Sequence, residues 1–290
     1  MPLASFSTRG DTPRLGKVFG DSLIDLSLVA PELPRDVIGF LNAGADAIAR
    51  YDSVSRESGS LIAIKDVTLH APITAPEKFL AIGMNYADHG AEAVKLGLEV
   101  PKFQLWFNKQ VSCINGPFDG VVSPKVSEKL DYEVELAVVI GKTCRYISET
   151  DAPSVIGGYM ICNDVSTRDW QLRTPTMTLG KSFDTHGPIG PWLTLPHELA
   201  DPHALTLRTL VNGEQRQLGN TRNLIFNIWQ QISYLSQVMT LKPGDILATG
   251  TPAGVGVAMD PPRFLSVGDV VRVEIEGLGH LENRVIADPL

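Results

Sequence analysis

The 290-residue sequence predicts a mainly β protein with some α structure: a mostly antiparallel or mixed β barrel or sandwich, with a small N-terminal α+β domain. Apolar runs of strand length recur from Phe79 to Gly277 without regular helical crossovers between them, which does not suit a parallel α/β sheet. Asn212-Gly213 stands between two alternating runs and predicts a tight β-hairpin. One long segment of this region, residues 225–239, has clear helical spacing.

The predicted N-terminal domain comprises residues 1–70. Short strands are expected within 16–27, and apolar residues at helical spacing predict a helix over Asp36–Ile48. Its buried side would carry Val37, Ile38, Phe40 and Leu41. The polar run 51–60 has loop composition, and two prolines in 70–78 precede the first strongly apolar strand. We therefore place the domain boundary between Ile62 and Pro76, with a catalytic domain over 71–290.

The second domain is expected to consist mainly of strands. They are predicted, in chain order, over 79–83, 120–124, 131–141, 155–164, 190–195, 205–211, 245–250 and 269–277. The helix over 225–239 should end before Lys242-Pro243-Gly244, because proline and glycine do not continue a helix.

Composition excludes several classes of partner. A net charge of -8 and a pI near 5.3 argue against nucleic acid or an anionic membrane, which bind basic surfaces. The first fifteen residues lack an apolar signal segment, and no window approaches the roughly 20 apolar residues of a spanning helix, so we expect a cytoplasmic protein. Three cysteines without C-x-x-C spacing and six histidines without H-x-x-x-H spacing predict neither disulfides nor a zinc site.

The run "LDYEVELAVVIG" contains the first group of residues that could carry chemistry. Asp131, Glu133 and Glu135 alternate along one face of a predicted strand that becomes apolar further on, so the carboxylates lie where the strand enters a core. Asp164 ends the next apolar run. Carboxylate oxygens at neighbouring strand ends suit a hard divalent cation, with about three of six positions left open. A solvated strand face with a turn-capping Asp164 is the alternative.

Two further groups accompany the carboxylates. His89 and Glu92, three residues apart on a predicted helix, lie on one face, where the glutamate would orient the imidazole as a base. Arg168 and Lys181 are the cations that an anionic substrate would need near such a metal site, and Gln171 accompanies Arg168. A surface ion pair and ordinary surface charges are the alternative explanations.

The glycine-rich stretch 248–257 does not match a nucleotide site. It lacks the lysine of the phosphate-binding loop and the G-x-G-x-x-G spacing. Its backbone N–H groups and the Thr251 hydroxyl could hold a carboxylate, and a plain tight turn is the alternative. A serine hydrolase is excluded because G-x-S-x-G is absent.

Seven blocks in order resemble the fumarylacetoacetate hydrolase family: "AIGMNYADHGAE", "DYEVELAVVIGK", "NDVSTRDWQ", "LGKSFDTHGPIGP", "VNGE", "GDILATGTPAGVG" and "FLSVGDVVRVEIEGLG". The resemblance covers Phe79 to Ile286 and points to the bacterial branch with an added N-terminal domain and to the domain-2-containing relatives of animals. It implies a mixed β-roll, a Mg²⁺ or Mn²⁺ cofactor, a homodimer and a 2-oxo acid substrate.

The resemblance also implies roles for individual residues. The metal ligands would be Glu133, Glu135 and Asp164, with no ligand role for Asp131. His89 and Glu92 would form a catalytic dyad on a lid, Lys181 would be catalytic, and Tyr86, Arg168, Gln171 and Thr251 would bind substrate. Met84 departs from the basic residue that several acylpyruvate-cleaving relatives carry, so the resemblance does not specify the substrate.

The expected reaction is hydrolysis of a C–C bond in a 2,4-dioxo acid, either an acylpyruvate or a diketo-deoxy sugar acid. His89 would activate the water that attacks C4, and Lys181, with Gln171, would stabilise the oxyanion. Pyruvate and a carboxylic acid would be released. The alternatives are an oxaloacetate decarboxylase or a 2-oxo acid hydratase or isomerase with the same metal–enolate chemistry, and a non-catalytic metal-stabilised binding domain.

Overall fold

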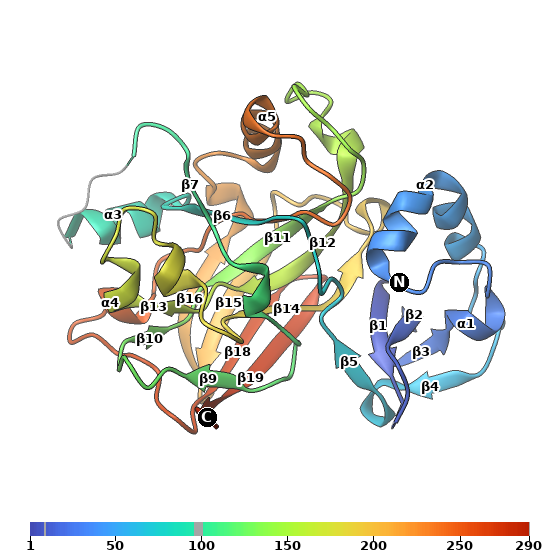
Figure 1. Cartoon of the computed structure of the whole chain (residues 1–290), viewed down its shortest axis with the longest axis horizontal. Coiled ribbons are helices and arrows are strands. Elements are labelled where there is room, and N and C mark those ends of the chain that lie inside the picture. Colours follow the sequence, from blue (N-terminus) through green and yellow to red (C-terminus); the bar gives the residue numbers. More distant parts are fainter. Residues whose placement is uncertain (9, 96–100, 290) are drawn as a thin grey trace.

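The centre of the molecule is a pair of sheets packed face to face around an apolar core (Figure 1). The structure, a computed structural model, describes residues 1–8, 10–95 and 101–289. In this part of the chain the strands form sheets of twelve, five and two strands. The mainly β fold with few helices agrees with the prediction.

The twelve-stranded sheet runs through most of the molecule. Its order is β4 (Leu61–Ala63), β3 (Ser22–Asp25), β2 (Arg14–Phe19), β1 (Leu3–Ser7), β14 (Gly187–Thr194), β12 (Ile156–Asn163), β11 (Val134–Ile140), β17 (Ile246–Ala248), β6 (Phe79–Gly83) and β7 (Leu105–Asn108). β5 (Thr68–His70) also pairs with β1, and β8 (Ile114–Asn115) with β14. Most pairs are antiparallel, but β17 and β6 run parallel, so the sheet is mixed.

The five-stranded sheet has the order β16 (Glu214–Asn220), β15 (Thr206–Val211), β18 (Val270–Ile275), β19 (Gly279–Ala287) and β9 (Val121–Ser123). The predicted hairpin is confirmed: Asn212 and Gly213 join β15 to β16, both with positive φ, as a tight type I′ turn requires. The two-stranded sheet pairs β10 (Leu130–Asp131) with β13 (Ser166–Thr167).

The helices are α1 (Leu26–Val29), α2 (Val37–Asp52), α3 (Ala87–Lys95), α4 (Arg168–Gln171) and α5 (Ile228–Val238). The predicted N-terminal helix is α2, which the Asp36 side chain caps. It continues to Asp52, so the predicted end at Ile48 is wrong, as is the predicted loop at Tyr51 and Asp52. The helix predicted from Ile225 begins later, because Asn227 and Gln230 form a capping box that sets its start. No helix in the described ranges is long and apolar enough to cross a membrane.

Strand β11 is buried on both faces, which explains its continuous apolar run. Val134, Leu136 and Val138 face the core shared with the five-stranded sheet, whereas Ala137 and Val139 face a second core. The prediction of one strand over 131–141 is wrong at Tyr132 and Glu133, where the chain leaves β10 before β11 begins. Asp131 therefore belongs to a different sheet from Glu135.

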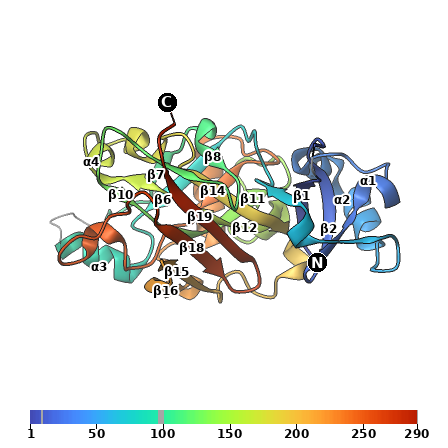
Figure 2. The same cartoon turned by 90° about the horizontal axis from the view of Figure 1, so that it is seen from below.

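The N-terminal residues share a sheet and a core with the rest of the chain. They lie at one end of the molecule in both views (Figures 1 and 2), where Leu3 of β1 pairs with Leu193 of β14. Phe40 of α2 belongs to the same buried cluster as Met160 of β12 and Ile189 of β14. A distinct N-terminal domain is therefore not shown, and the division at residue 70 stays a prediction.

The shared core predicts that both parts unfold together. Phe40 is fully buried, so Phe40→Ala should cost about 3–5 kcal/mol of unfolding free energy through lost burial and an internal cavity. The four tryptophans, at 106, 170, 192 and 229, lie outside the N-terminal segment, so their fluorescence in a urea titration should record this loss. Leu28→Ala, at a position 77% exposed, is the control. A tryptophan transition unchanged by Phe40→Ala would indicate a separate domain.

Candidate metal centre and active-site cavity

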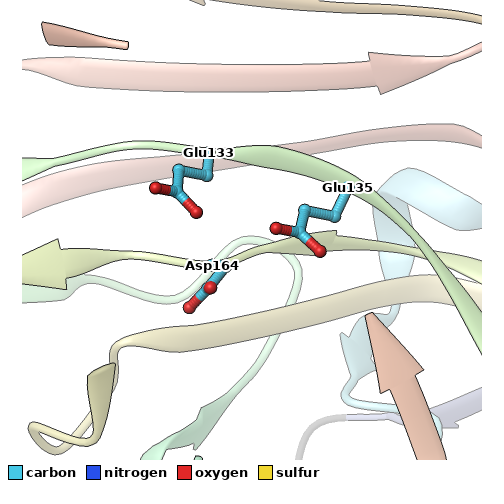
Figure 3. Close-up of side chains that lie close together, drawn as sticks. All are labelled: Glu133, Glu135 and Asp164. Carbon is cyan, nitrogen blue, oxygen red and sulfur yellow. The ribbon is translucent and has the colours of Figure 1, made fainter. Parts of the chain in front are cut away.

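Three buried carboxylates lie together where β11 begins beside the end of β12. Glu133 directly precedes β11, Glu135 lies within it, and Asp164 directly follows β12. The antiparallel register sets Val134 opposite Asn163, so the start of one strand meets the end of the other. One oxygen from each carboxylate lies within 4.8 Å of the others, and the three side chains lie close together in Figure 3. The predicted cluster is therefore present.

Two buried lysines balance part of this negative charge. Nζ of Lys181 lies 2.8 Å from Oε2 of Glu133 and 2.7 Å from Oδ2 of Asp164. Nζ of Lys109, directly after β7, lies 2.7 Å from Oδ1 of Asp164 and also donates to the backbone oxygen of Lys181. Burial lowers the pKa of Lys109, but the charge and hydrogen bond of Asp164, together with the neighbouring Cys113 and Cys162, outweigh burial and raise the pKa above its usual value. Both lysines therefore hold the carboxylates in place.

Arg168, the first residue of α4, joins the carboxylate of Asp131 in β10 to that of Glu133, which directly precedes β11. Its Nε donates to Oδ2 of Asp131 at 2.8 Å, and its Nη1 donates to Oε1 of Glu133 at 2.6 Å and to Oε1 of Gln171 at 3.0 Å. Its Nη2 is buried and has no hydrogen-bond partner among the described residues. The two N–H donors of Nη2 therefore remain available to a ligand.

The electrostatic balance of the cluster fits a divalent cation. Burial raises the pKa of Glu135, and the neighbouring Asp164 and Glu133 charges raise it further, well above its usual value. Burial also disfavours charged Glu133, but Lys181 and Arg168 hold its pKa well below the usual range. With Asp131 included, four buried carboxylates face three buried cations, so one negative charge is left over.

The uncompensated negative charge lies on Glu135. Its Oε2 accepts a hydrogen bond from the Gly250 N–H at 2.7 Å, and it forms no ion pair in the described part of the chain. An oxygen-only donor set of three carboxylates is the type that Mg²⁺ or Mn²⁺ prefers. The residues present therefore fit such an ion.

Glu133 and Glu135 of the carboxylate cluster line a cavity of about 320 Å³, whereas Asp164 is absent from the described lining. The lining of the cavity includes eight of the predicted site residues: His89, Glu92, Glu133, Glu135, Arg168, Gln171, Lys181 and Thr251. Most of the remaining lining is apolar: Ile82, Met84, Leu105, Phe107, Leu172, Met177, Val255, Val257 and Ala258, together with Gly83. Polar groups thus occupy part of a mostly apolar cavity, as in small-molecule sites.

His89 and Glu92 of α3 face each other across this cavity wall. Nδ1 of His89 lies 3.2 Å from Oε2 of Glu92, and Oε1 of Glu92 accepts a hydrogen bond from the Gly254 N–H at 2.9 Å. The helix predicted for this segment is confirmed, and its spacing brings both side chains to one face. The loop that contains Gly254 therefore fixes the glutamate that orients the histidine.

Tyr86 and Thr251 differ in how they relate to the cavity. Tyr86 is fully buried in the core beside Leu80 and Tyr132, and it is absent from the described cavity lining. Its hydroxyl has no partner among the described residues. Thr251 lines the cavity, and its Oγ1 accepts a hydrogen bond from Nε2 of Gln217 at 2.8 Å. The substrate-binding role of Tyr86 stays a prediction that this geometry does not favour.

Sequence reasoning missed Lys109 and gave no role to Asp131. Lys109 follows an apolar strand in "LWFNKQ", where a lysine resembles an ordinary strand-end charge. Asp131 was recognised as part of the carboxylate face, but three of its four hydrogen-bond partners come from the distant residues 168, 256 and 257. Neither the contact between Lys109 and Asp164 nor these long-range contacts of Asp131 can be predicted from nearby residues in the sequence.

Comparison with known proteins assigns the family. A family model described as "Fumarylacetoacetate (FAA) hydrolase C-terminal" matches residues 78–286. A mitochondrial oxaloacetate tautomerase of Bos taurus is 42% identical over 278 residues, which cover 94% of this chain and 88% of that protein. Because this relative is an animal protein, the comparison does not assign the chain to the predicted bacterial branch of the family.

Two solved structures share the fold over nearly the whole chain. A fumarylacetoacetate hydrolase from Exiguobacterium antarcticum has a TM-score of 0.88 at 34% identity and covers 99% of this chain and 100% of its own. A maleylpyruvate hydrolase from Sphingobium sp. SYK-6, in complex with manganese(II) and pyruvate, has a TM-score of 0.81 at 33% identity and covers 99% of each chain. The chain therefore belongs to the fumarylacetoacetate hydrolase family of enzymes.

Proposed function

We propose that this enzyme hydrolyses the C3–C4 bond of a 2,4-dioxo acid with Mg²⁺ or Mn²⁺ bound by Glu133, Glu135 and Asp164. The observation that carries the proposal is that Glu133 and Glu135 of the carboxylate cluster line the same cavity as the His89–Glu92 pair. The apolar wall of that cavity suits the acyl substituent of an acylpyruvate. The manganese and pyruvate in the maleylpyruvate hydrolase structure support this substrate class.

The bound ion would supply Lewis-acid stabilisation of the 2-oxo acid as it becomes an enolate. The protein keeps its three ligands apart and aligned: Lys181 holds Glu133 and Asp164, and the Gly250 N–H holds Glu135. Lys109 holds the second oxygen of Asp164 from the buried side. Each of these contacts orients a ligand before substrate arrives.

His89 would act as the general base. With the Nδ1–H of His89 donating a hydrogen bond to Glu92, Nε2 would be free to take a proton from the attacking water. The water oxygen forms a bond to C4, and the C3–C4 bond then breaks with its electron pair moving to C3. The enolate of pyruvate that results takes up a proton, and the acyl group leaves as a carboxylic acid.

Lys181 and Gln171 would stabilise the oxyanion at C4. Nζ of Lys181 uses two of its three N–H donors on carboxylates, so one remains for the developing charge. Nε2 of Gln171 contacts only the Met177 sulfur, at 3.9 Å, among the described residues, so this amide also has donors available. One well-placed donor of this kind contributes about 3 to 4 kcal/mol.

Keto–enol tautomerisation of oxaloacetate is the second candidate reaction. The Bos taurus tautomerase supports it, and so does the free Nη2 of Arg168, which could bind the second carboxylate of this substrate. In this reaction a base such as His89 would move a proton between C3 and the keto oxygen. Decarboxylation of oxaloacetate or isomerisation of another 2-oxo acid would need the same enolate stabilisation.

We also propose a homodimer in the cytoplasm, two points that stay predictions. The Bos taurus relative is named as a mitochondrial protein. Size-exclusion chromatography with light scattering measures the oligomeric state directly.

Removal of the metal should abolish turnover. A panel of acylpyruvates, oxaloacetate, 2,4-diketo-3-deoxy sugar acids and fumarylpyruvate should show activity with Mg²⁺ or Mn²⁺ and none after EDTA. Glu135→Gln keeps the shape of the ligand but removes its charge, so calorimetry should show Mn²⁺ affinity reduced by at least about 10-fold. Glu214→Gln, at an exposed position, is the control. Turnover indifferent to EDTA would exclude the proposal.

Replacement of the base should separate the candidate reactions. His89→Ala should lower kcat for acylpyruvate cleavage by roughly 10²–10⁴-fold, because a positioned base contributes this much. Decarboxylation of oxaloacetate needs no attacking water and should survive. Both rates come from the same enzyme preparation by coupled pyruvate assay. Equal loss of both activities would show that His89 is not a water-activating base.

Replacement of Arg168 tests the second candidate reaction, the tautomerisation of oxaloacetate. Arg168→Lys should raise KM for oxaloacetate tautomerisation by about 10- to 100-fold, since a hydrogen bond to a charged group contributes about 1.5–3 kcal/mol. The matched comparison is an acylpyruvate with a neutral acyl group in the same variant, which reports damage to Glu133 alone. A KM change of equal size for both substrates would contradict a specific contact with the second carboxylate.

A further inference from the structure

We propose that Asp131 is a positioning residue, which fixes both the Arg168 guanidinium and the cavity loop Gly254–Ala258 and so aligns Glu133 and the His89–Glu92 pair. The proposal extends the function above and rests on it for its kinetic readouts.

The Asp131 carboxylate is enclosed by hydrogen-bond donors. Its Oδ1 accepts from the N–H groups of Tyr132 at 2.9 Å and Gly256 at 2.8 Å. Its Oδ2 accepts from Nε of Arg168 at 2.8 Å and from the Val257 N–H at 2.9 Å. The side chain is fully buried. Four donors satisfy both oxygens, which explains why Asp131 does not join the neighbouring carboxylates that converge on the candidate ion.

The first connection runs through Arg168 to a candidate metal ligand. Asp131 holds Nε of the guanidinium, and Glu133 accepts from Nη1 alone. Without the Asp131 charge, the guanidinium would be free to rotate and turn one edge, with two N–H donors, toward both oxygens of Glu133. A bidentate arginine contact would then compete with the ion for the Glu133 oxygens. Asp131 thus limits how strongly Arg168 holds Glu133.

The second connection runs through the loop to the base. Val255, Val257 and Ala258 of this loop line the cavity, and the Gly254 N–H holds Glu92. The loop approaches Asp131 closely: a Cβ at Gly256 would lie 2.7 Å from Oδ1 of Asp131 and 2.2 Å from the Arg263 oxygen. Glycine is therefore required where the loop meets the carboxylate, and a shift there would be transmitted to Glu92.

Asp131→Asn tests both connections with almost no change of volume. The amide nitrogen of asparagine is a hydrogen-bond donor. In either orientation of the amide this nitrogen faces other donors, Nε of Arg168 or the N–H groups of the loop, and the hydrogen bonds at that position are lost. We expect kcat for 2-oxo acid turnover to fall about 10- to 100-fold, as small misplacements of catalytic groups do. Affinity for Mn²⁺ alone, measured by calorimetry, should fall several-fold.

Asp245→Asn is the matched control. Asp245 is also fully buried and accepts from the N–H groups of Lys78 and Lys242 and from Nζ of Lys78, but it is not part of the cavity lining. Both variants should lower the thermal unfolding midpoint, and only Asp131→Asn should weaken Mn²⁺ binding and lower kcat. Equal Mn²⁺ affinities and equal kcat in the two folded variants would show that Asp131 is only structural.

A double mutant tests whether Asp131 acts on His89 through the loop. If Asp131 acts on acylpyruvate cleavage through the dyad, Asp131→Asn should cost less in a His89→Ala background than in the wild type. Full additivity would overturn the loop connection. If Asp131→Asn does not fold, Asp131→Glu, which keeps the charge and displaces both oxygens, gives the same comparison.

The two proposals fail in different ways. If the wild-type enzyme turns over no 2-oxo acid, the proposed function fails, but the Mn²⁺ affinities of Asp131→Asn and Asp245→Asn still decide the Arg168 connection. If turnover is normal and both variants bind Mn²⁺ and turn over alike, only the role of Asp131 fails.

Discussion

Compensation of buried charge is the constraint on which the rest of this site depends. Glu133, Glu135 and Asp164 are withdrawn from water at the meeting of two strands, and burying a carboxylate without a partner costs several kcal/mol. The compensating cations come from three separate segments: Lys109 after β7, Arg168 at the start of α4, and Lys181 near α4. Each ion pair connects one of these segments to the central sheet. The ion pairs that compensate the carboxylates therefore also hold the walls of the cavity in place.

The position of β11 between two cores explains why the charges lie so deep. Apolar side chains fill both faces of this strand, and the carboxylates begin where that packing ends. The surrounding low dielectric strengthens every interaction with an ion or an anionic substrate. The same burial explains why Glu135, which has no ion pair in the described part of the chain, carries a raised pKa and is well suited to bind a cation.

Local pattern was sufficient for several elements of the fold, whereas the roles of the candidate-site residues were predicted from the family resemblance. The Asn212-Gly213 hairpin, helix α2 and the spacing of His89 and Glu92 all depend on contacts within a few residues. The break between β10 and β11 was missed because alternation continues through Tyr132 and Glu133 while hydrogen bonding changes sheets. The shared N-terminal core was missed because pairing of β1 with β14 joins residues about 190 positions apart.

The sequence by itself determined which residues were available for metal and acid–base chemistry, because carboxylate alternation and helical spacing are local properties. The tertiary structure decided how those residues are used. In the folded chain Arg168 contacts Asp131 and Glu133, and Lys109 contacts Asp164. Tyr86 is absent from the described cavity lining. Such contacts follow from burial and charge pairing between distant segments, and no spacing along the chain records them. Asp131 is the clearest case, since three of its four hydrogen bonds come from residues 37 to 126 positions away.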